Sequence, residues 1–527
     1  MRLGNAGVGL AVALAAGLAT AAEGPPRGPA TAEGPSRTIL APNVQPIDLN
    51  TALRLAGAQN PELLLARQRV VEAVYVHQFA AAQIIPTLNA GTNYDTHTGT
   101  LQQSNGNILS VTRSAVYVGA GSFAVAAGTV SIPGLVLAGN VAEGVFRYLI
   151  TKQVIRRQQF TEAAVRNQVL LRVATAYCEL LRAEGHRAIA EQIRDRAAEI
   201  ERIIAAYARI ELGLKADADR AATELGRRRA AVRQAEGEML TASARLARVL
   251  FLDPSVRLHP TDGAIVPLPI VPEPIPLREL VATAVLRRPE LAERRVVIRE
   301  ALLELGGSKL LPFSPTILVG FSAGGFGGGS NLVTPVFGGF GGRSDFDAVA
   351  YWTLQNLGVG NVALINLAKA HLKAKQFEEM IVLDQVRDEV AEAHARTHAR
   401  FAQIVEQEQA VRSSLEGFRL DFERIKQGVP SQGDNPRPIE VLDSLKLLRQ
   451  AQDDYLDAII DYNRAHFELY VALGQPPANA LARPVPTSGV GLAPEPPRRS
   501  PAPTPMPPPP AEGRGPFARP EAAAAGR

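Results

Sequence analysis

The sequence has only one cysteine and one tryptophan among its 527 residues. Because Cys178 has no partner in the chain, an internal disulfide is excluded and the fold must be stabilised by packing. Beyond the N-terminal segment, no run approaches the ~20 apolar residues that a membrane-spanning helix needs. If the chain enters a membrane, it therefore does so through strands.

A strong excess of charge is also missing. The formal net charge of +4 is small for this length, and no basic run occurs in the core of the sequence. Nucleic acid is therefore not expected as a partner. No Ser/His/Asp or Cys/His arrangement can be argued from the sequence, so we expect neither an enzyme nor a bound cofactor.

The glycine-rich stretch 324–343 lacks both common phosphate-binding patterns, G-x-x-x-x-G-K-[ST] and a G-x-G-x-x-G that opens a helix. It also has no basic residue before Arg343. We interpret it as an external loop between two strands rather than as a nucleotide site.

The two ends of the chain have compositions of their own. Residues 1–22 combine Arg2, an apolar run and the small-residue sequence Ala19-Thr20-Ala21, which is typical of a secretory signal peptide. Residues 23–46 are rich in proline and glycine, and residues 478–527 are rich in proline. Such segments cannot bury a core, so we expect a disordered linker and a disordered tail.

One short sequence motif occurs twice. NPELLLAR at 60–67 returns as RPELAERR at 288–295, and IDLNTALRLAGAQ at 47–59 resembles IPLRELVATAVLR at 275–287. The sequence therefore predicts an internal duplication. We place the first repeat at 47–257 and the second at 275–477, joined by a proline-rich connector at 258–274.

Each repeat predicts a helix, a pair of strands and then two very long helices. Asn60 is a suitable N-cap, whereas Arg288 occupies the same place in the second copy and should cap less well. Period-two patterns place strands within about 87–126 and 316–356. Apolar steps of three and four, and a heptad of Leu448, Tyr455, Tyr462 and Leu469, predict long hairpins at about 142–252 and 361–474.

These elements limit the architectures that a membrane allows. Four strands cannot close a barrel, because the smallest outer-membrane barrels use about eight. Open strand edges are not tolerated in lipid, so several chains must contribute strands to one barrel. The polar helices must then project into an aqueous compartment, and a closed assembly of this kind is a tube.

The order of these features resembles the TolC-like outer membrane efflux proteins. The resemblance covers about residues 45–477 and includes PIEVLDSLKLLRQAQDDYLDA at 438–458, which is similar to the family's D-V-L-D-A-x-x-x-L segment. It implies a mainly α fold with a small membrane β portion. It also implies a homotrimer with a twelve-stranded barrel in the outer membrane lipid and a long α-helical barrel in the periplasm.

The same resemblance implies the exit duct of a tripartite efflux or secretion system, with a periplasmic membrane-fusion adaptor and an inner-membrane pump as partners. The alternative is a periplasmic coiled-coil adaptor or structural protein that is not inserted in the membrane. This alternative would be favoured if the strands carried no lipid-facing alternation, and the first strand pair contains few large apolar residues.

Two carboxylates begin the last long helix. Glu440 and Asp443 stand three residues apart and so share one helix face. They are suited to the positive end of the helix dipole. The resemblance also implies a periplasmic gate, in which these side chains form carboxylate rings that select cations, while Arg437 pairs with a neighbouring chain and Asp434 joins the ring.

The other hairpin tip offers a possible adaptor contact. By similarity to the family's G-L-x-x-x-D segment, Gly213, Leu214 and Lys215 would touch the adaptor, and Asp217 and Asp219 would begin the next helix. An ordinary glycine-capped helix hairpin explains the same residues. Near the end of the second strand pair, we assign Tyr351 and Trp352 to an aromatic belt at the membrane interface.

His394 and His398 lie four residues apart on one predicted helix face, a spacing that can bind a metal ion. No glutamate separates them as in H-E-x-x-H. We therefore interpret them as solvated surface histidines, and we predict no metal site.

Overall fold

The computed structural model describes residues 44–120, 134–272, 275–427 and 438–476. The described residues all belong to one compact unit, and the second unit, 483–527, lies outside them. The predicted signal peptide, nearly all of the linker and the whole tail also lie outside them, as do Asp434 and Arg437.

Four helices recur in the same order in the two repeats, with lengths of 11, 22, 69 and 35 residues each time. The first set is α2 (Leu49–Gln59), α3 (Pro61–Ala82), α4 (Val141–Arg209) and α5 (Lys215–Val249). The second set is α6 (Leu277–Arg287), α7 (Pro289–Leu310), α8 (Val359–Gln427) and α9 (Pro438–Ala472). The predicted duplication of a helix, strands and a long hairpin is thus confirmed.

The repeated motif, at 60–67 and 288–295, contains the starts of α3 and α7. The Asn60 side chain accepts hydrogen bonds from the backbone N–H groups two and three residues further on, whereas Arg288 makes no cap bond. Both residues also reach the last helix of their own repeat. Asn60 Nδ2 donates to the carbonyl of Val249 at 3.3 Å, and Arg288 donates to that of Ala472 at 3.4 Å. The two starts therefore occupy equivalent positions with different chemistry.

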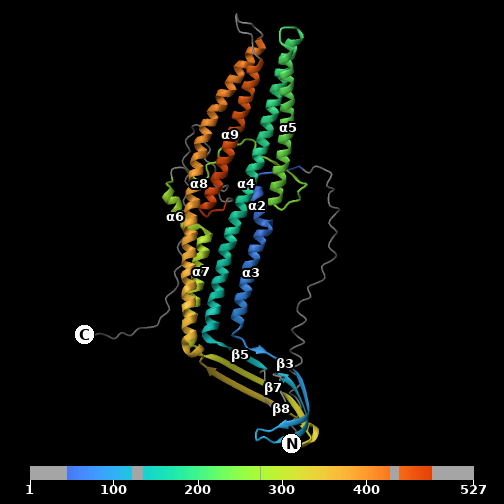
Figure 1. Cartoon of the computed structure of the whole chain (residues 1–527), viewed down its shortest axis with the longest axis vertical. Helices are drawn as coiled ribbons and strands as arrows, with labels where there is room; N and C mark the ends of the chain where they lie inside the picture. Colours follow the sequence, from blue (N-terminus) through green and yellow to red (C-terminus); the bar gives the residue numbers. More distant parts are fainter. Residues whose placement is uncertain (1–43, 121–133, 273–274, 428–437, 477–527) are drawn as a thin grey trace, which may run out of the picture. The chain divides into compact units, whose positions relative to one another are not determined.

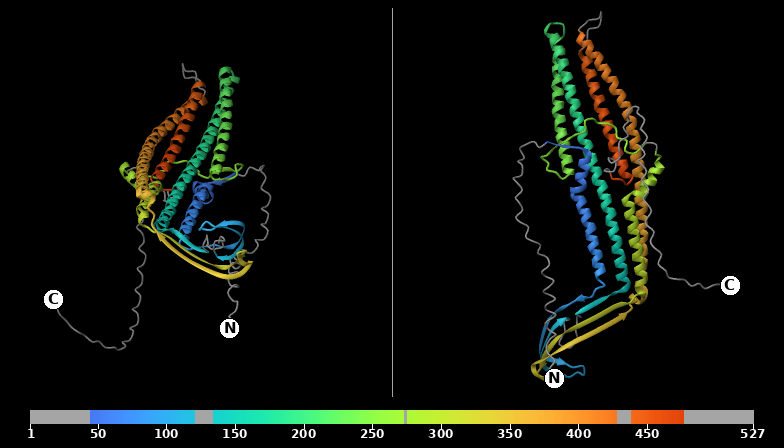
Figure 2. Two further views of the ribbon diagram at one scale, coloured as in Figure 1. Left: turned by 60° about the horizontal axis from the view of Figure 1, so that its bottom comes forward. Right: turned by 180° about the vertical axis from the view of Figure 1, so that it is seen from behind.

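The long helices α4 and α8 each change partners along their length (Figure 1). Toward the sheet, α4 contacts α3 and α7, and α8 contacts α7. Toward the tips, α4 packs on α5 and α9, and α8 packs on α9 (Figure 2). At 1.5 Å per residue, a helix of 69 residues is about 100 Å long, so it needs partners over its whole length.

The predicted helix seams form the core. Ile193, Ile200 and Ile204 of α4 are buried together with Leu445 and Leu448 of α9. A second core surrounds Tyr177 of α4, which is 1% exposed. Both cores contain residues of α4, from the first repeat, and of α9, from the second, so they join the two repeats.

The sheet consists of antiparallel strands. They are β2 (Thr87–Leu88), β3 (Ala90–Gln102), β4 (Ile108–Ala120), β5 (Leu135–Asn140), β7 (Thr316–Ser330) and β8 (Val333–Tyr351). β4 and β5 pair with successive parts of β7, and β3 and β2 continue outside them. β8 pairs with the other side of β7. The described sheet is therefore four strands wide, in the order β3, β4, β7 and β8 in one part and β2, β5, β7 and β8 in the other.

One expectation about this sheet was wrong, since the glycine-rich stretch 324–343 is mostly strand instead of loop. The second strand of the first pair, expected within 87–126, is β4, and residues 121–126 lie outside the described residues. Glycine is needed in the glycine-rich stretch because neighbouring backbones come very close. A Cβ on Gly328 would lie 2.2 Å from the carbonyl oxygen of Ser114, and one on Gly324 would lie 2.5 Å from that of Val118.

A small parallel pair also differs from expectation. β1 (Val44–Ile47) pairs with β6 (Arg257–Pro260), so the end of the expected linker and the start of the expected connector are ordered against each other. Ile47 and Leu258 are buried in the core around Tyr177, which stabilises the pair. None of the described helices combines the length and the apolar composition that crossing a membrane would require.

Candidate functional site: a two-faced sheet and two helical tips

The strand register gives the sheet two unlike faces. Paired residues share a face, and successive residues of a strand alternate between faces. We define the apolar face by the set that contains Val118 with its partner Gly325, and Phe321 with its partner Phe346. Its large side chains are Leu88, Tyr94, Ile108, Val116, Val118, Leu135, Leu137, Ile317, Val319, Phe321, Phe340 and Phe346.

Across 90–102, 108–120, 135–140, 316–330 and 340–351, the apolar face carries no charged side chain. Its other positions are mostly Gly, Ala, Ser and Thr. Several of its large residues are open to the surroundings of the single chain, including Phe340 at 71% and Phe346 at 67% exposed. A sheet face of this composition is suited to contact with lipid.

Every charged side chain in those strand residues lies on the opposite face, which we name the charged face. They are Asp95, Arg113, Arg343, Asp345 and Asp347. Arg343 Nε donates to the Asp345 carboxylate at 2.7 Å. The charged face is therefore suited to water, as is the inner wall of a membrane channel.

The two aromatic residues assigned to an interface belt are separated by this register. Tyr351 pairs with Thr316 and belongs to the charged face. Trp352 follows the end of β8, is 60% exposed and donates its indole N–H to the carbonyl of Phe313 at 3.2 Å. The alternation thus argues against a lipid-facing Tyr351, whereas the role of Trp352 remains a prediction.

At the tip of the second hairpin, both predicted carboxylates are exposed on the first turns of α9. Glu440 accepts from Arg424 of α8 at 3.0 Å, and Asp443 accepts from Lys446 at 2.9 Å. Sequence reasoning missed Arg424 because it lies near the end of the preceding helix. Each carboxylate therefore has a cation on its own chain, and Arg437 and Asp434 lie outside the described residues.

At the tip of the first hairpin, the residue in the left-handed region is Glu211, with φ of 60°. Gly213 lies in the turn between α4 and α5, and its N–H donates to the carbonyl of Tyr207 at 3.2 Å. Leu214 and Lys215 are exposed, as expected for contact residues.

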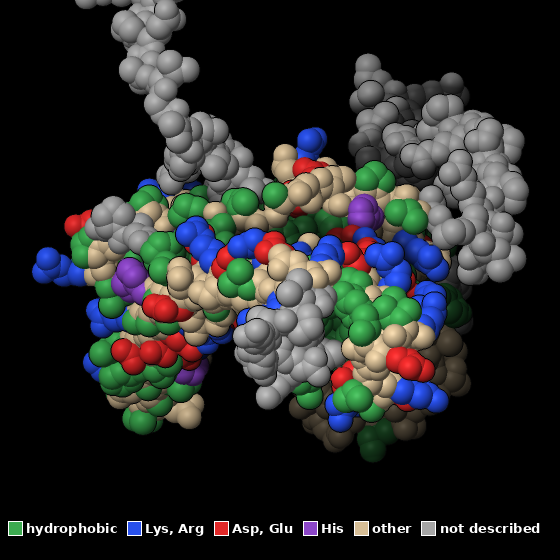
Figure 3. Space-filling view, turned by 90° about the horizontal axis from the view of Figure 1, so that it is seen from above, with side chains coloured by type: hydrophobic (Ala, Val, Ile, Leu, Met, Phe, Trp, Pro, Cys, Tyr) green, Lys and Arg blue, Asp and Glu red, His purple; other side chains and the backbone are tan. Residues whose placement is uncertain are grey.

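The start of α5 carries two acidic side chains, of which Asp217 is paired with a cation of its own helix. Asp217 accepts from Arg220 at 3.0 Å, while Asp219 is exposed. Three apolar side chains are exposed at this tip, since Ile210, Leu212 and Leu214 have exposed fractions of 62%, 76% and 69%. The first two had no role in the sequence-based prediction. Seen from above in Figure 3, acidic, basic and hydrophobic side chains are intermixed.

A cluster of charges joins α4 to α9 below the tips. His186 lies 2.9 Å from Asp453 and 3.2 Å from Asp457, and Arg449 donates to Asp453 at 3.1 Å. Hydrogen bonds to the two carboxylates raise the pKa of His186 to about 9. The sequence offered no sign of this cluster because its members come from opposite repeats.

Cys178 lies in the core around Tyr177. Burial raises the pKa of the Cys178 thiol to about 12, so it stays a thiol and packs as an apolar side chain. Among the described residues, no group of three or more His, Cys, Asp or Glu side chains is arranged to hold a metal ion.

No protein-family model matches the sequence. No curated protein matches it either.

Solved structures do match. The outer-membrane channel OprN has a TM-score of 0.63 at 18% identity, covering 81% of this chain and 89% of that one. VceC, an outer membrane protein from Vibrio cholerae, has 0.60 at 14%, with 81% and 96% covered. The open MtrE outer membrane channel of Neisseria gonorrhoeae has 0.59 at 18%, with 81% and 89% covered.

The chain therefore has the fold of outer-membrane channels. This is the fold that the resemblance of the repeats and strands to TolC-like proteins led us to expect.

Proposed function

We propose that this protein is the outer-membrane exit duct of an efflux or secretion system. Three copies join their sheets into one twelve-stranded barrel in the outer membrane, and their helices form a tunnel in the periplasm. Transport through the duct is passive. The observation that carries the proposal is the division of the sheet into an apolar face and a charged face.

The sheet edges support association of several copies. Among the described strands, β3 pairs only with β4, and β8 pairs only with β7. Open edges in lipid cost several kcal/mol for each unpaired backbone group, so another copy must supply the missing partners. Four strands from each of three copies make twelve, which lies within the known range of closed outer-membrane barrels.

The helices also support association. In the single chain, α3 leaves large apolar side chains exposed, and so does α8. They are Leu64, Leu65, Tyr75, Val76 and Phe79 on α3, with Val362, Leu367, Phe377, Met380 and Ile381 on α8. Apolar surface on this scale is typical of an interface, and a second copy of the chain supplies the matching surface in our proposal.

The tips fit the remaining parts of the proposal. Exposed Ile210, Leu212 and Leu214, next to Lys215, form the surface that we assign to a periplasmic adaptor. That adaptor connects the duct to an inner-membrane pump. Glu440 and Asp443 form the periplasmic gate, and the Arg424–Glu440 ion pair favours its closed state. The cargo is set by the pump, since a passive duct need not discriminate.

A coiled-coil adaptor or structural protein outside the membrane would have no need of a charge-free sheet face. The test is to express the full chain, separate inner from outer membranes, purify it from the outer-membrane fraction and record single channels in a planar bilayer. We expect a detergent-requiring trimer with a discrete conductance. A protein that stays soluble without detergent, or one that forms no conductance, would overturn the proposal.

A further inference from the structure

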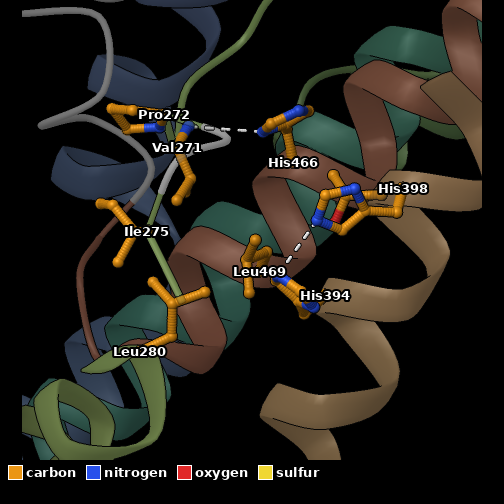
Figure 4. Close-up of a pocket in the computed structure, with 9 residues that line it drawn as sticks. Val271, Pro272, Ile275, Leu280, His394, His398, His466 and Leu469 are labelled. Atoms are coloured by element: carbon orange, nitrogen blue, oxygen red, sulfur yellow. Dashed lines mark hydrogen bonds between the residues drawn. The ribbon is translucent and has the colours of Figure 1, made fainter. Parts of the chain in front are cut away.

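Two histidines of α8 face each other on its surface. The Nε2 atoms of His394 and His398 are 3.1 Å apart, and their ring centroids are separated by 4.5 Å (Figure 4). His398 is exposed and His394 is partly buried. The two Nε2 atoms thus meet at hydrogen-bonding distance, instead of extending separately into solvent.

A third histidine adjoins the pair. His466 of α9 lines the same pocket and is 2% exposed (Figure 4). Its Nδ1 accepts a hydrogen bond from the backbone N–H of Val271 at 3.3 Å, so the ring hydrogen is on Nε2. That Nε2 is buried without a hydrogen-bond partner. A buried donor of this kind calls for an acceptor, and the pocket provides space for one.

The pocket has room for a water molecule but not for an organic ligand. Its volume is about 20 Å³, and a single water needs roughly 10–15 Å³ by the same measure. Val271, Ile275, Leu280 and Leu469 form its apolar wall. The polar atoms at its mouth are those of the histidines and Thr397, whose hydroxyl already donates to Ala393 at 2.6 Å.

The spacing of the two exposed nitrogens fits two ligands of one metal ion. With Zn–N bonds of about 2.0–2.1 Å, tetrahedral ligands lie about 3.3 Å apart and ligands at a right angle about 2.9 Å apart. Imidazole is a preferred ligand of Zn²⁺, Cu²⁺ and Ni²⁺.

Nearby charges do not oppose a cation. Arg396 lies between the two histidines in sequence, but it is paired with both Glu392 and Glu468. Arg400 is paired with Asp461 at 3.2 Å. The local field is therefore close to balanced, and the exposed side of the histidine pair remains open to solvent ligands.

We propose that His394 and His398 form a two-histidine chelating site for a divalent transition-metal ion, with water completing the coordination and His466 donating Nε2–H to one of those waters. His466 is not a ligand, because its free electron pair is used at Nδ1. The order of affinities should be Cu²⁺ above Ni²⁺ and Zn²⁺. The site does not depend on the proposed channel function.

The test uses the full-length protein in detergent, freed of metal and titrated with Cu²⁺ alone. Calorimetry should show one tight site, and electron paramagnetic resonance should show a Cu²⁺ signal with two coupled imidazole nitrogens. His394→Ala and His398→Ala should each remove the tight site and the two-nitrogen signal. His371→Ala, an exposed histidine of the same helix, is the matched control and should leave both unchanged.

A second variant tests the spacing rather than the number of histidines. His398→Ala combined with Ala399→His keeps the number of histidines on α8 but moves one off the shared face, and it should also lose the tight site. His466→Phe should weaken Cu²⁺ about tenfold, as loss of an outer partner does, and keep the two-nitrogen signal. Equal affinity in His394→Ala, or in the moved pair, would overturn the proposal and show adventitious binding elsewhere.

Discussion

His186 Nδ1 on α4 lies 2.9 Å from the carboxylate of Asp453 on α9, and this contact joins the first repeat to the second. The ring is held from its other side by Asp457 at 3.2 Å. Arg182 and Arg449 also pair with these carboxylates, so the cluster is closely balanced. The protonated imidazole is thus part of the contact between the two long hairpins.

The first prediction concerns pH. The folded-state pKa of His186, about 9, lies above its ordinary value of 6.5. Its contribution to stability is therefore complete below about pH 6.5 and is lost as the pH rises through about 9. After allowance for solvent screening, we expect about 1–2 kcal/mol of the free energy of unfolding to disappear across this window.

Denaturant unfolding of the full protein at pH values from 6 to 10, followed by circular dichroism, measures this slope. His186→Gln should be less stable at pH 6 and should lack that part of the slope. His371→Gln on the exposed side of α8 should keep it. A slope that is unchanged in His186→Gln would contradict the prediction.

The second prediction compares the two sheet faces with a matched pair of valines. Val118 on the apolar face and Val349 on the charged face are 57% and 49% exposed. Arginine on a lipid face costs about 2–4 kcal/mol at the bilayer midplane, whereas a wall that faces water tolerates it. Val118→Arg should therefore sharply reduce the amount of trimer in the outer membrane, and Val349→Arg should not.

Membrane fractionation and unheated gel electrophoresis measure the yield of trimer for both variants. If the two arginines have the same effect, the assignment of the faces is wrong. The result is independent of any assay of transport.

The third prediction concerns the tip of the second hairpin. Arg424→Gln removes the only described ion pair between Glu440 and α8. Because exposed pairs contribute about 1 kcal/mol or less, the closed state should lose at most about fivefold in population, and channel openings should become more frequent. Arg419→Gln is the control, since Arg419 pairs only with Glu416 and Glu423 of its own helix among the described residues.

Removal of the two carboxylates should change how the channel conducts and selects ions. Glu440→Gln with Asp443→Asn removes two negative charges from each chain at the proposed gate. Cation preference and block by divalent cations should then fall in single-channel records. Unchanged conductance and block would exclude these residues from the gate.

The fourth prediction concerns the start of α3. Asn60→Ala removes the bonds that cap the helix and the bond to the carbonyl of Val249, and Asn60 is 2% exposed. We expect a loss of about 1–3 kcal/mol in the free energy of unfolding. Asn60→Ser keeps a capping oxygen but is too short for Val249, so it should lie between the wild type and alanine in thermal unfolding.

The long helices were predictable because their pattern of apolar residues continues over many turns. The seam residues Ile193, Ile200 and Ile204 repeat over many turns, and all three are buried. The same reasoning failed for Gly324 and Gly328, because a run of glycines in sequence has the composition of a loop. Only the pairing with β4 shows that the close approach of two backbones requires them.

Contacts between segments far apart in the chain could not be predicted from the sequence. β1 and β6 are strands of four residues, too short for a periodic signal, and they come from opposite ends of the first repeat. Arg424 and Glu440 lie on either side of a tip, and His466 joins His394 and His398 only through packing of α9 on α8. In each case the chemistry depends on which side chains meet, which local pattern does not encode.

The identical helix lengths of the two repeats have a consequence for how such a chain can change. Removing seven residues from each arm of one hairpin alone would shorten it by about 10 Å and leave the two tips at unequal heights. The same deletion in both hairpins would keep them level. Insertions and deletions in this gene should therefore survive mainly as matched pairs, so that each half constrains the evolution of the other.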